Sequence, residues 1–277
     1  MVTLKQRLRL FPFCVLSLLT LLGSKSLLAQ QDSLEQRQPL ELVFADSIVP
    51  QDRHEMMSTT GIWYFRNGIS RNASVTQKIE WGISDQLQIS TFVHLMNRSN
   101  QAGAMQSGFG DFEIGARYSW PKVGFEFTHI AIALDAGFPT GNSQRGLGEG
   151  NYSVSPSVLF SCEPGQGKYQ LFNTTGAEFI TAHRRLAPFQ DDPRSSIFSN
   201  SGISLHAGRG WLVGEVAVSS NRVNGGNETQ SSLTPSYIRR IAKRTELLIG
   251  VPVGLTSSTD RIGGVIKFTF ELGGGDK

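Results

Sequence analysis

The chain has 277 residues, of which 39% are hydrophobic and 18% charged, with a formal net charge of +3. This length suits one large β domain or two small ones. Residues 1–29 hold four bases and no acid, so their removal turns the charge of +3 into −1 and excludes a nucleic-acid-binding role argued from basicity.

Residues 1–29 have the pattern of a secretory signal peptide. Three bases open the stretch, an apolar run follows over 11–22, and Ala29 offers a small residue for cleavage. The run is too short to cross a membrane as a helix of the mature protein. We expect export and a mature chain that begins near Gln30, with a retained membrane anchor as the alternative.

Residues 30–54 are polar at first and then carry apolar patches at 40–44 and 48–50. This stretch precedes the repetitive part of the chain. We predict a periplasmic lead-in or a plug segment within a pore, and an extra strand is the remaining alternative.

From residue 55 onward, alternating segments repeat along the chain, each close to the 9–11 residues that cross a bilayer as a tilted strand. No second apolar run approaches the length of a membrane helix, so a mature membrane protein of this sequence would be a β-barrel. The fold class predicted is all-β, an antiparallel up-and-down transmembrane barrel of about twelve strands over 55–272, followed by a tail at 273–277. The predicted strands are 56–66, 73–83, 86–96, 109–120, 125–138, 151–162, 168–180, 196–207, 210–220, 231–241, 245–256 and 260–271.

The connections alternate in length. Five are short and rich in turn formers, at 83–86, 121–124, 163–167, 208–210 and 242–244. Four are long and polar, at 97–108, 139–150, 182–194 and 221–229. This alternation places the long loops at one end of an up-and-down barrel, as in outer-membrane barrels with short periplasmic turns.

The closing hairpin, 245–271, has one apolar face and one polar face. Leu247, Ile249 and Ile266 lie on the apolar face, and Lys267 lies on the other. In a soluble β-sandwich the apolar face would meet a second sheet, whereas in a membrane barrel it meets lipid. Charges and glycines on the opposite faces favour a wet lumen over a packed core.

The same alternation assigns a set of charged side chains to the lumen. These residues would form either a polar pathway that selects solutes or an ion-pair network that fills a narrow barrel. The candidate lumen-lining residues are Lys78, Glu80, Asp111, Glu113, Arg117, Glu178, Glu215, Glu246, Arg261, Lys267 and Glu271.

Four segments, at 78–90, 108–120, 133–142 and 246–255, resemble recurrent segments of a bacterial family of outer-membrane barrels. The chain is similar to the phenol-degradation meta-pathway transporter-like family. That resemblance implies an outer-membrane barrel that moves apolar or aromatic compounds. The closing strand also looks like the signal read by the barrel-assembly machinery. Outer-membrane lipid, this machinery and a small solute are therefore the expected partners, without nucleic acid.

Catalysis and metal binding have weak support in the sequence. His94 and Ser99 near Glu80 and Glu113 would suit a lipid-modifying barrel enzyme, but no Gly-x-Ser-x-Gly motif is present. Beyond residue 29 Cys162 is the only cysteine, which gives neither an internal disulfide nor a zinc site. We expect no catalytic residue, metal or cofactor. The leading hypothesis is a passive channel for small solutes, with a secreted or periplasmic β-sandwich binding protein and a lipid-modifying barrel enzyme as alternatives.

Overall fold

The computed structural model describes residues 38–48, 50–68, 70–99, 105–120, 122–123, 128–164, 168–183, 195–223 and 226–273. The predicted signal peptide, most of the loop predicted at 182–194 and nearly all of the predicted tail lie outside these ranges.

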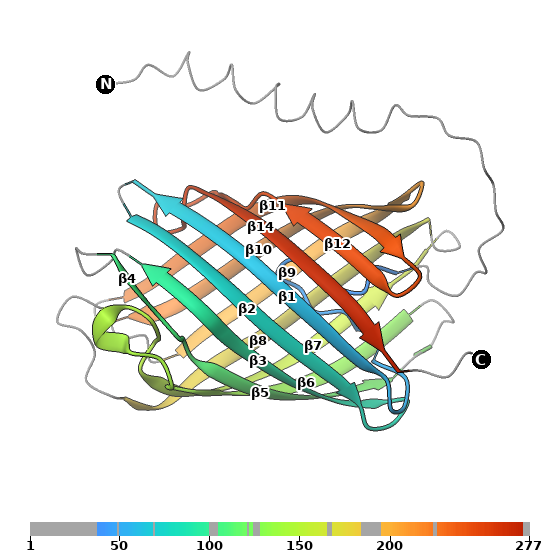
Figure 1. Cartoon of the computed structure of the whole chain (residues 1–277), viewed down its shortest axis with the longest axis horizontal. Coiled ribbons are helices and arrows are strands. Elements are labelled where there is room, and N and C mark those ends of the chain that lie inside the picture. Colours follow the sequence, from blue (N-terminus) through green and yellow to red (C-terminus); the bar gives the residue numbers. More distant parts are fainter. Residues whose placement is uncertain are drawn as a thin grey trace, which may run out of the picture. The chain divides into compact units, whose positions relative to one another are not determined.

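Long antiparallel strands dominate the described chain (Figure 1). Their bounds are β1 Met56–Asn67, β2 Ser70–Gly82, β3 Leu87–Ser99, β4 Gln106–Gly108, β5 Phe112–Trp120, β6 Thr128–Phe138, β7 Asn151–Cys162, β8 Tyr169–His183, β9 Ser195–Ala207, β10 Gly210–Val223, β11 Gly226–Ala242, β12 Thr245–Gly250, β13 Val253–Gly254 and β14 Ile262–Leu272. A 3-10 turn spans Ser143–Arg145, and none of the helical structure in the described ranges is long and apolar enough to cross a bilayer.

The strands form one closed sheet. Each long strand pairs with the next one along the chain, and β1 pairs with β14 from Met56 opposite Leu272 to Arg66 opposite Ile262. The short β4 adds to β3, and β13 continues the position of β12, so the barrel has twelve staves. The predicted up-and-down barrel is confirmed. The alternative of two stacked sheets is wrong, because the first and last strands close a single sheet.

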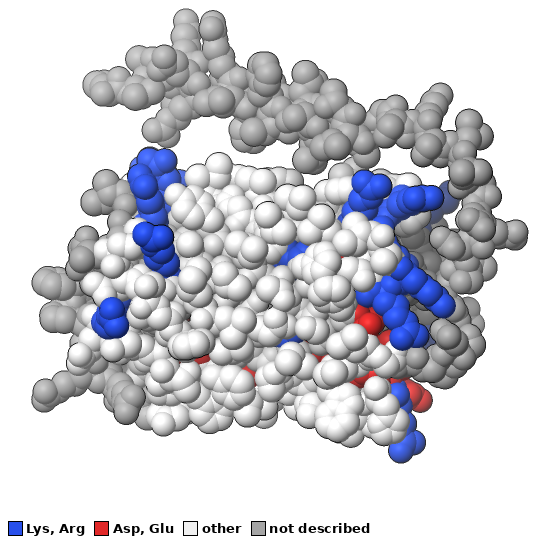
Figure 2. Space-filling view, viewed as in Figure 1, with Lys and Arg blue, Asp and Glu red and all other residues white. Residues whose placement is uncertain are grey.

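The outer surface carries the apolar residues of each strand. Ile62, Leu134 and Val158 are each 53% exposed, which is unusual for large aliphatic side chains in a water-soluble fold. Figure 2 shows a largely uncharged middle, with Lys and Arg gathered toward the two ends. Trp81 and Trp120 lie exposed beside short turns, where an interfacial aromatic girdle belongs.

Several predicted boundaries differ from the structure; the loop predicted at 97–108, for example, contains the end of β3 and all of β4. The long loop predicted at 221–229 is mostly strand, because polar residues of β10 and β11 pair up to Val223 opposite Gly226. The strand predicted at 245–256 is interrupted after Gly250, where Pro252 has no N–H to donate to a neighbouring strand. Polarity had indicated a loop at 221–229, but cross-strand pairing needs no apolar side chains.

We expect Ile132→Lys to destabilise the folded barrel. Ile132 is 48% exposed on the outer face near the middle of β6, and a lysine at a bilayer midplane costs about 2–4 kcal/mol. Urea titration of the barrel in lipid vesicles, followed by heat-modifiable gel migration, measures the loss. Ala133→Ser, on the inward face of the same strand, is the matched control and leaves the midpoint within error.

Candidate functional site: the barrel lumen

Residues 38–48 and 50–51 lie inside the barrel, and we call the stretch 38–51 the lumenal segment (Figure 1). Their backbone and side chains contact inward-facing side chains of β2, β3, β5, β10, β12 and β14. The segment then leads directly into the start of β1. The candidate site is built from these contacts.

Two glutamates on neighbouring parts of the wall accept hydrogen bonds from the backbone of the lumenal segment. The Glu215 carboxylate of β10 accepts from the N–H groups of Val43, Phe44 and Ala45 at 2.7, 2.8 and 2.9 Å. The Glu246 carboxylate of β12 accepts from Leu40 N–H at 2.9 Å. Glu215 is fully buried, so these three donors replace the water that its charge would otherwise require.

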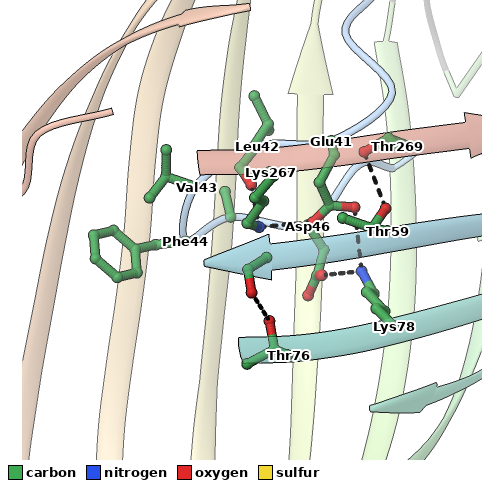
Figure 3. A network of polar contacts seen from close by, with 12 residues as sticks. Glu41, Leu42, Val43, Phe44, Asp46, Thr59, Thr76, Lys78, Lys267 and Thr269 are labelled. Atoms are coloured by element: carbon green, nitrogen blue, oxygen red, sulfur yellow. Dashed lines mark hydrogen bonds and ion pairs between the residues drawn. The ribbon is translucent and has the colours of Figure 1, made fainter. Parts of the chain in front are cut away.

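Two lysines hold the segment from the other side (Figure 3). Lys267 Nζ of β14 lies 3.0 Å from Glu41 Oε1 and donates to the Leu42 carbonyl at 2.6 Å. Lys78 Nζ of β2 lies 3.6 Å from Glu41 Oε2 and 3.0 Å from Asp46 Oδ1. The acids of the segment therefore neutralise the lysines of the wall.

A further polar group anchors the end of the segment near β1. Arg117 of β5 donates to Gln88 of β3 at 2.8 Å, and Gln88 in turn accepts from Gln51 N–H at 3.1 Å. Ser119 Oγ donates to the Ile48 carbonyl at 3.0 Å. The charged interior thus forms one connected network with residues 38–51.

Apolar packing adds to the polar contacts. Leu42, Val43 and Ala45 are buried against a cluster that includes Phe172 and Trp211. Trp211 is 3% exposed and faces inward, on the same face of β10 as Glu215. The main hydrophobic core of this barrel therefore lies within the lumen and includes the lumenal segment.

A cavity of about 470 Å³ lies beside the lumenal segment, and we call it the vestibule. Phe44 and Asn200 belong to both, since Asn200 Nδ2 donates to the Phe44 carbonyl at 3.0 Å. Partial burial raises the pKa of the Asp260 carboxyl above its ordinary value. The lining residues are Phe44, Phe65, Asn67, Asn72, Phe198, Asn200, Ala217, Val218, Ser219, Gln230, Ser231, Ser232, Pro252, Ser258, Thr259 and Asp260.

The lining includes the facing ends of β1 and β2, the middle of β10 and the first half of β11. Asn67 ends β1 and Asn72 lies near the start of β2, so the vestibule reaches the end of the barrel that carries the longer connections. The lumenal segment is anchored instead to wall residues that include Glu246, at the start of β12 beside a short turn. The segment and the vestibule therefore occupy successive parts of the lumen.

The predicted lumen-lining residues divide into two groups. Six of them, Lys78, Glu80, Arg117, Glu215, Glu246 and Lys267, belong to the network around the lumenal segment. The other five lie outside this network. Asp111 accepts from loop backbone, and Glu178 accepts from Ser196 at 3.3 Å. Glu113 shares the inward face of β5 with Arg117, Arg261 is exposed in the connection before β14, and Glu271 lies near the end of β14.

Sequence reasoning missed Glu41 and Asp46 as charges of the lumen. Both lie among apolar residues of the lead-in. An acid between apolar residues is a visible signal, but without a strand period it does not show which way the side chain points. Both carboxylates point to lysines of the wall, Glu41 to Lys267 and Asp46 to Lys78.

Of the two candidate enzyme residues, only the side chain of His94 is described. The His94 ring packs edge-on against Phe92 at 5.1 Å, and its Nδ1 is buried without a hydrogen-bond partner among the described atoms. The side chain of Ser99 lies outside what the structure describes. The described residues also contain no group of acidic, histidine or cysteine side chains suited to a metal ion.

Asp111 fastens the loop at 139–150, and Asp111→Ala is expected to loosen it. Its two carboxylate oxygens accept from Gly141 N–H at 2.8 Å and Glu149 N–H at 2.6 Å. Limited proteolysis of the folded barrel should cut this loop faster in the variant. Glu228→Ala, near the tip of the β10–β11 hairpin, is the control that should leave the cleavage rate at 139–150 unchanged.

A closed twelve-stave barrel with an apolar outer belt and a charged interior defines a transmembrane β-barrel of the outer-membrane type. The chain belongs to the family described as "Putative MetA-pathway of phenol degradation", whose model matches residues 55–231. The resemblance noted in the sequence is confirmed.

Solved structures show the same fold at low sequence identity. An outer-membrane channel from Pseudomonas putida F1 matches with a TM-score of 0.67 and 12% identity, over 83% of this chain and 100% of that one. The NanC porin matches with a TM-score of 0.55 and 10% identity, over 78% and 100%. The KdgM porin matches with a TM-score of 0.52 and 7% identity, over 79% and 99%. No curated protein matches the chain significantly.

Proposed function

We propose that this protein is a passive outer-membrane channel for small solutes and that its lumenal segment closes the lumen in the state described. The observation that carries the proposal is the contact of residues 40–46 with charged side chains of the wall, next to a vestibule of about 470 Å³. Solutes would enter the vestibule and pass when the segment moves aside.

The polar contacts that hold the segment can be exchanged for water or solute. They are hydrogen bonds and ion pairs to side chains, such as those of Glu215 and Lys267, and the described residues of the segment make no strand pairing with the barrel. The barrel's own ladder therefore stays complete when the segment leaves. A wall with a full set of backbone hydrogen bonds is what a membrane-spanning barrel requires.

Related channels and porins support this proposal. We infer that the protein is exported through its signal peptide and is inserted by the barrel-assembly machinery. It then faces outer-membrane lipid with its apolar belt. The mechanism uses diffusion alone, with no catalytic step and no cofactor. Apolar or aromatic solutes, which the family's description suggests, are candidates together with polar ones.

Liposome swelling tests the proposal. Refolded full-length protein is placed in vesicles, and the swelling rate is measured for neutral solutes of increasing size. We expect swelling above protein-free vesicles, falling as the solute approaches the size of the vestibule. Absence of solute-dependent swelling, both in the natural protein and in a variant that loosens the segment, would overturn the channel function.

A further inference from the structure

The lumenal segment is bound to the wall largely through its backbone. The Lys267 ammonium donates to the Leu42 carbonyl, and the Glu215 carboxylate accepts from the N–H groups of Val43, Phe44 and Ala45. The Glu41 carboxylate, between Lys267 and Lys78, is the main charged group that the segment adds here. Carbonyl and N–H groups occur in every peptide, so the wall recognises chemistry that is not unique to this chain.

The wall has two faces of opposite charge. Lys78 and Lys267, on β2 and β14, present ammonium groups, while Glu215 and Glu246, on β10 and β12, present carboxylates. Within the wall, Lys78 also pairs with Glu80 at 3.2 Å and Glu246 with Arg240 at 2.9 Å, so Lys267 and Glu215 depend most on the segment for partners. A molecule that fits both faces needs a carboxylate at one side and N–H donors at the other. The segment meets this demand with residues 40–45.

We propose that the permeation path contains a binding site for small dipolar solutes, namely acidic short peptides and N-acylated amino-acid derivatives, which bind where residues 40–45 now lie. The site rests on the proposed function, since the solute reaches it through the lumen. Residues 38–51 act as a tethered competitor for this site. A solute that binds there releases the segment and thereby promotes its own passage.

Buried charge makes the site selective. Glu215 is fully buried and Lys267 is 8% exposed, so either group loses its partners if the segment is displaced by an uncharged, apolar molecule. A solute with a carboxylate and N–H groups restores both sets of contacts. Selection therefore comes from the requirement to satisfy both faces at once.

The vestibule gives this site an approach. Phe44 lines the cavity and belongs to the bound part of the segment, so a solute in the cavity is already in contact with the segment. Asn200, which holds the Phe44 carbonyl, offers an amide to a peptide at the same place.

Thiol labelling tests the proposal without depending on flux. The full chain carries Ala45→Cys in a background of Cys14→Ser and Cys162→Ser, and a water-soluble maleimide reports when position 45, now 3% exposed, becomes accessible. The probe is acetyl-Glu-Leu-Val-amide, which repeats residues 41–43. The matched control is acetyl-Gln-Leu-Val-amide, which removes only the charge.

We expect labelling to accelerate saturably with the glutamyl probe, at a half-saturating concentration about tenfold or more below that of the glutaminyl control, as the loss of a charge-assisted hydrogen bond predicts. Lys267→Gln, checked for folding by heat-modifiable migration, is expected to abolish the difference between the two probes. Equal effects of both probes on the unsubstituted wall, or no effect of either, would overturn the site.

The two proposals fail separately. Carboxylate-dependent labelling in a protein that passes no solute would support the binding site and contradict the channel. Swelling with neutral solutes but no response to the glutamyl probe would support the channel and remove the site.

Discussion

Glu215→Gln is expected to release the lumenal segment and raise the conductance of the barrel several-fold. The carboxylate accepts three backbone hydrogen bonds, and each charge-assisted bond contributes about 1.5–3 kcal/mol. Glutamine keeps the shape of the side chain but removes its charge. It also places an NH2 donor against backbone N–H groups, where no hydrogen bond can form. Planar-bilayer recordings of the natural protein and the variant at the same salt concentration measure the change.

Glu228→Gln is the control for this experiment. Glu228 lies in β11 beyond the network, so its neutralisation should leave both the conductance and the labelling of Ala45→Cys unchanged. If Glu215→Gln behaves like Glu228→Gln while folding normally, Glu215 does not hold the segment in the lumen.

Glu41→Lys should expel the segment more completely. The new cation would replace a carboxylate that lies 3.0 Å from Lys267 Nζ and 3.6 Å from Lys78 Nζ, which turns two attractions into repulsions inside a poorly solvated lumen. We expect liposome swelling about tenfold faster than for the natural protein, because a few kcal/mol shifts the closed state to a minor population.

A reciprocal exchange separates electrostatics from general damage. Adding Lys267→Glu to Glu41→Lys restores an opposite pair, and swelling should fall back toward the natural rate. Vesicles that contain Lys267→Glu alone should also swell fast, because this substitution places a second carboxylate beside that of Glu41. Fast swelling that the double variant does not reverse would mean that this ion pair is not what closes the lumen.

Much of the barrel could be predicted from the sequence because its faces differ so strongly. In β14, Ile266 faces outward and Lys267 inward, and a period of two suffices to orient both. Trp211 and Glu215, four positions apart on β10, share the inward face for the same reason. Strand alternation thus predicted the barrel fold.

The position of the lumenal segment could not be predicted from strand alternation. Residues 38–51 have no strand or helix period, so neither their depth in the barrel nor their partners follow from spacing. Glu41 pairs with Lys267, which is 226 positions away in sequence, and a contact over that distance cannot be predicted from local sequence patterns. The outer part of the hairpin of β10 and β11 was predicted as a loop because its residues are polar, although they pair as strands up to Val223 opposite Gly226.

The single-channel current tests the central claim most directly. It is recorded from the full chain and from a variant in which residues 38–46 are replaced by a Gly-Ser stretch of equal length, with heat-modifiable migration confirming that both have folded. We predict a mostly closed pore with brief openings in the natural protein and a sustained, larger current in the variant. Equal currents from the two proteins would contradict closure of the lumen by its own N-terminal segment.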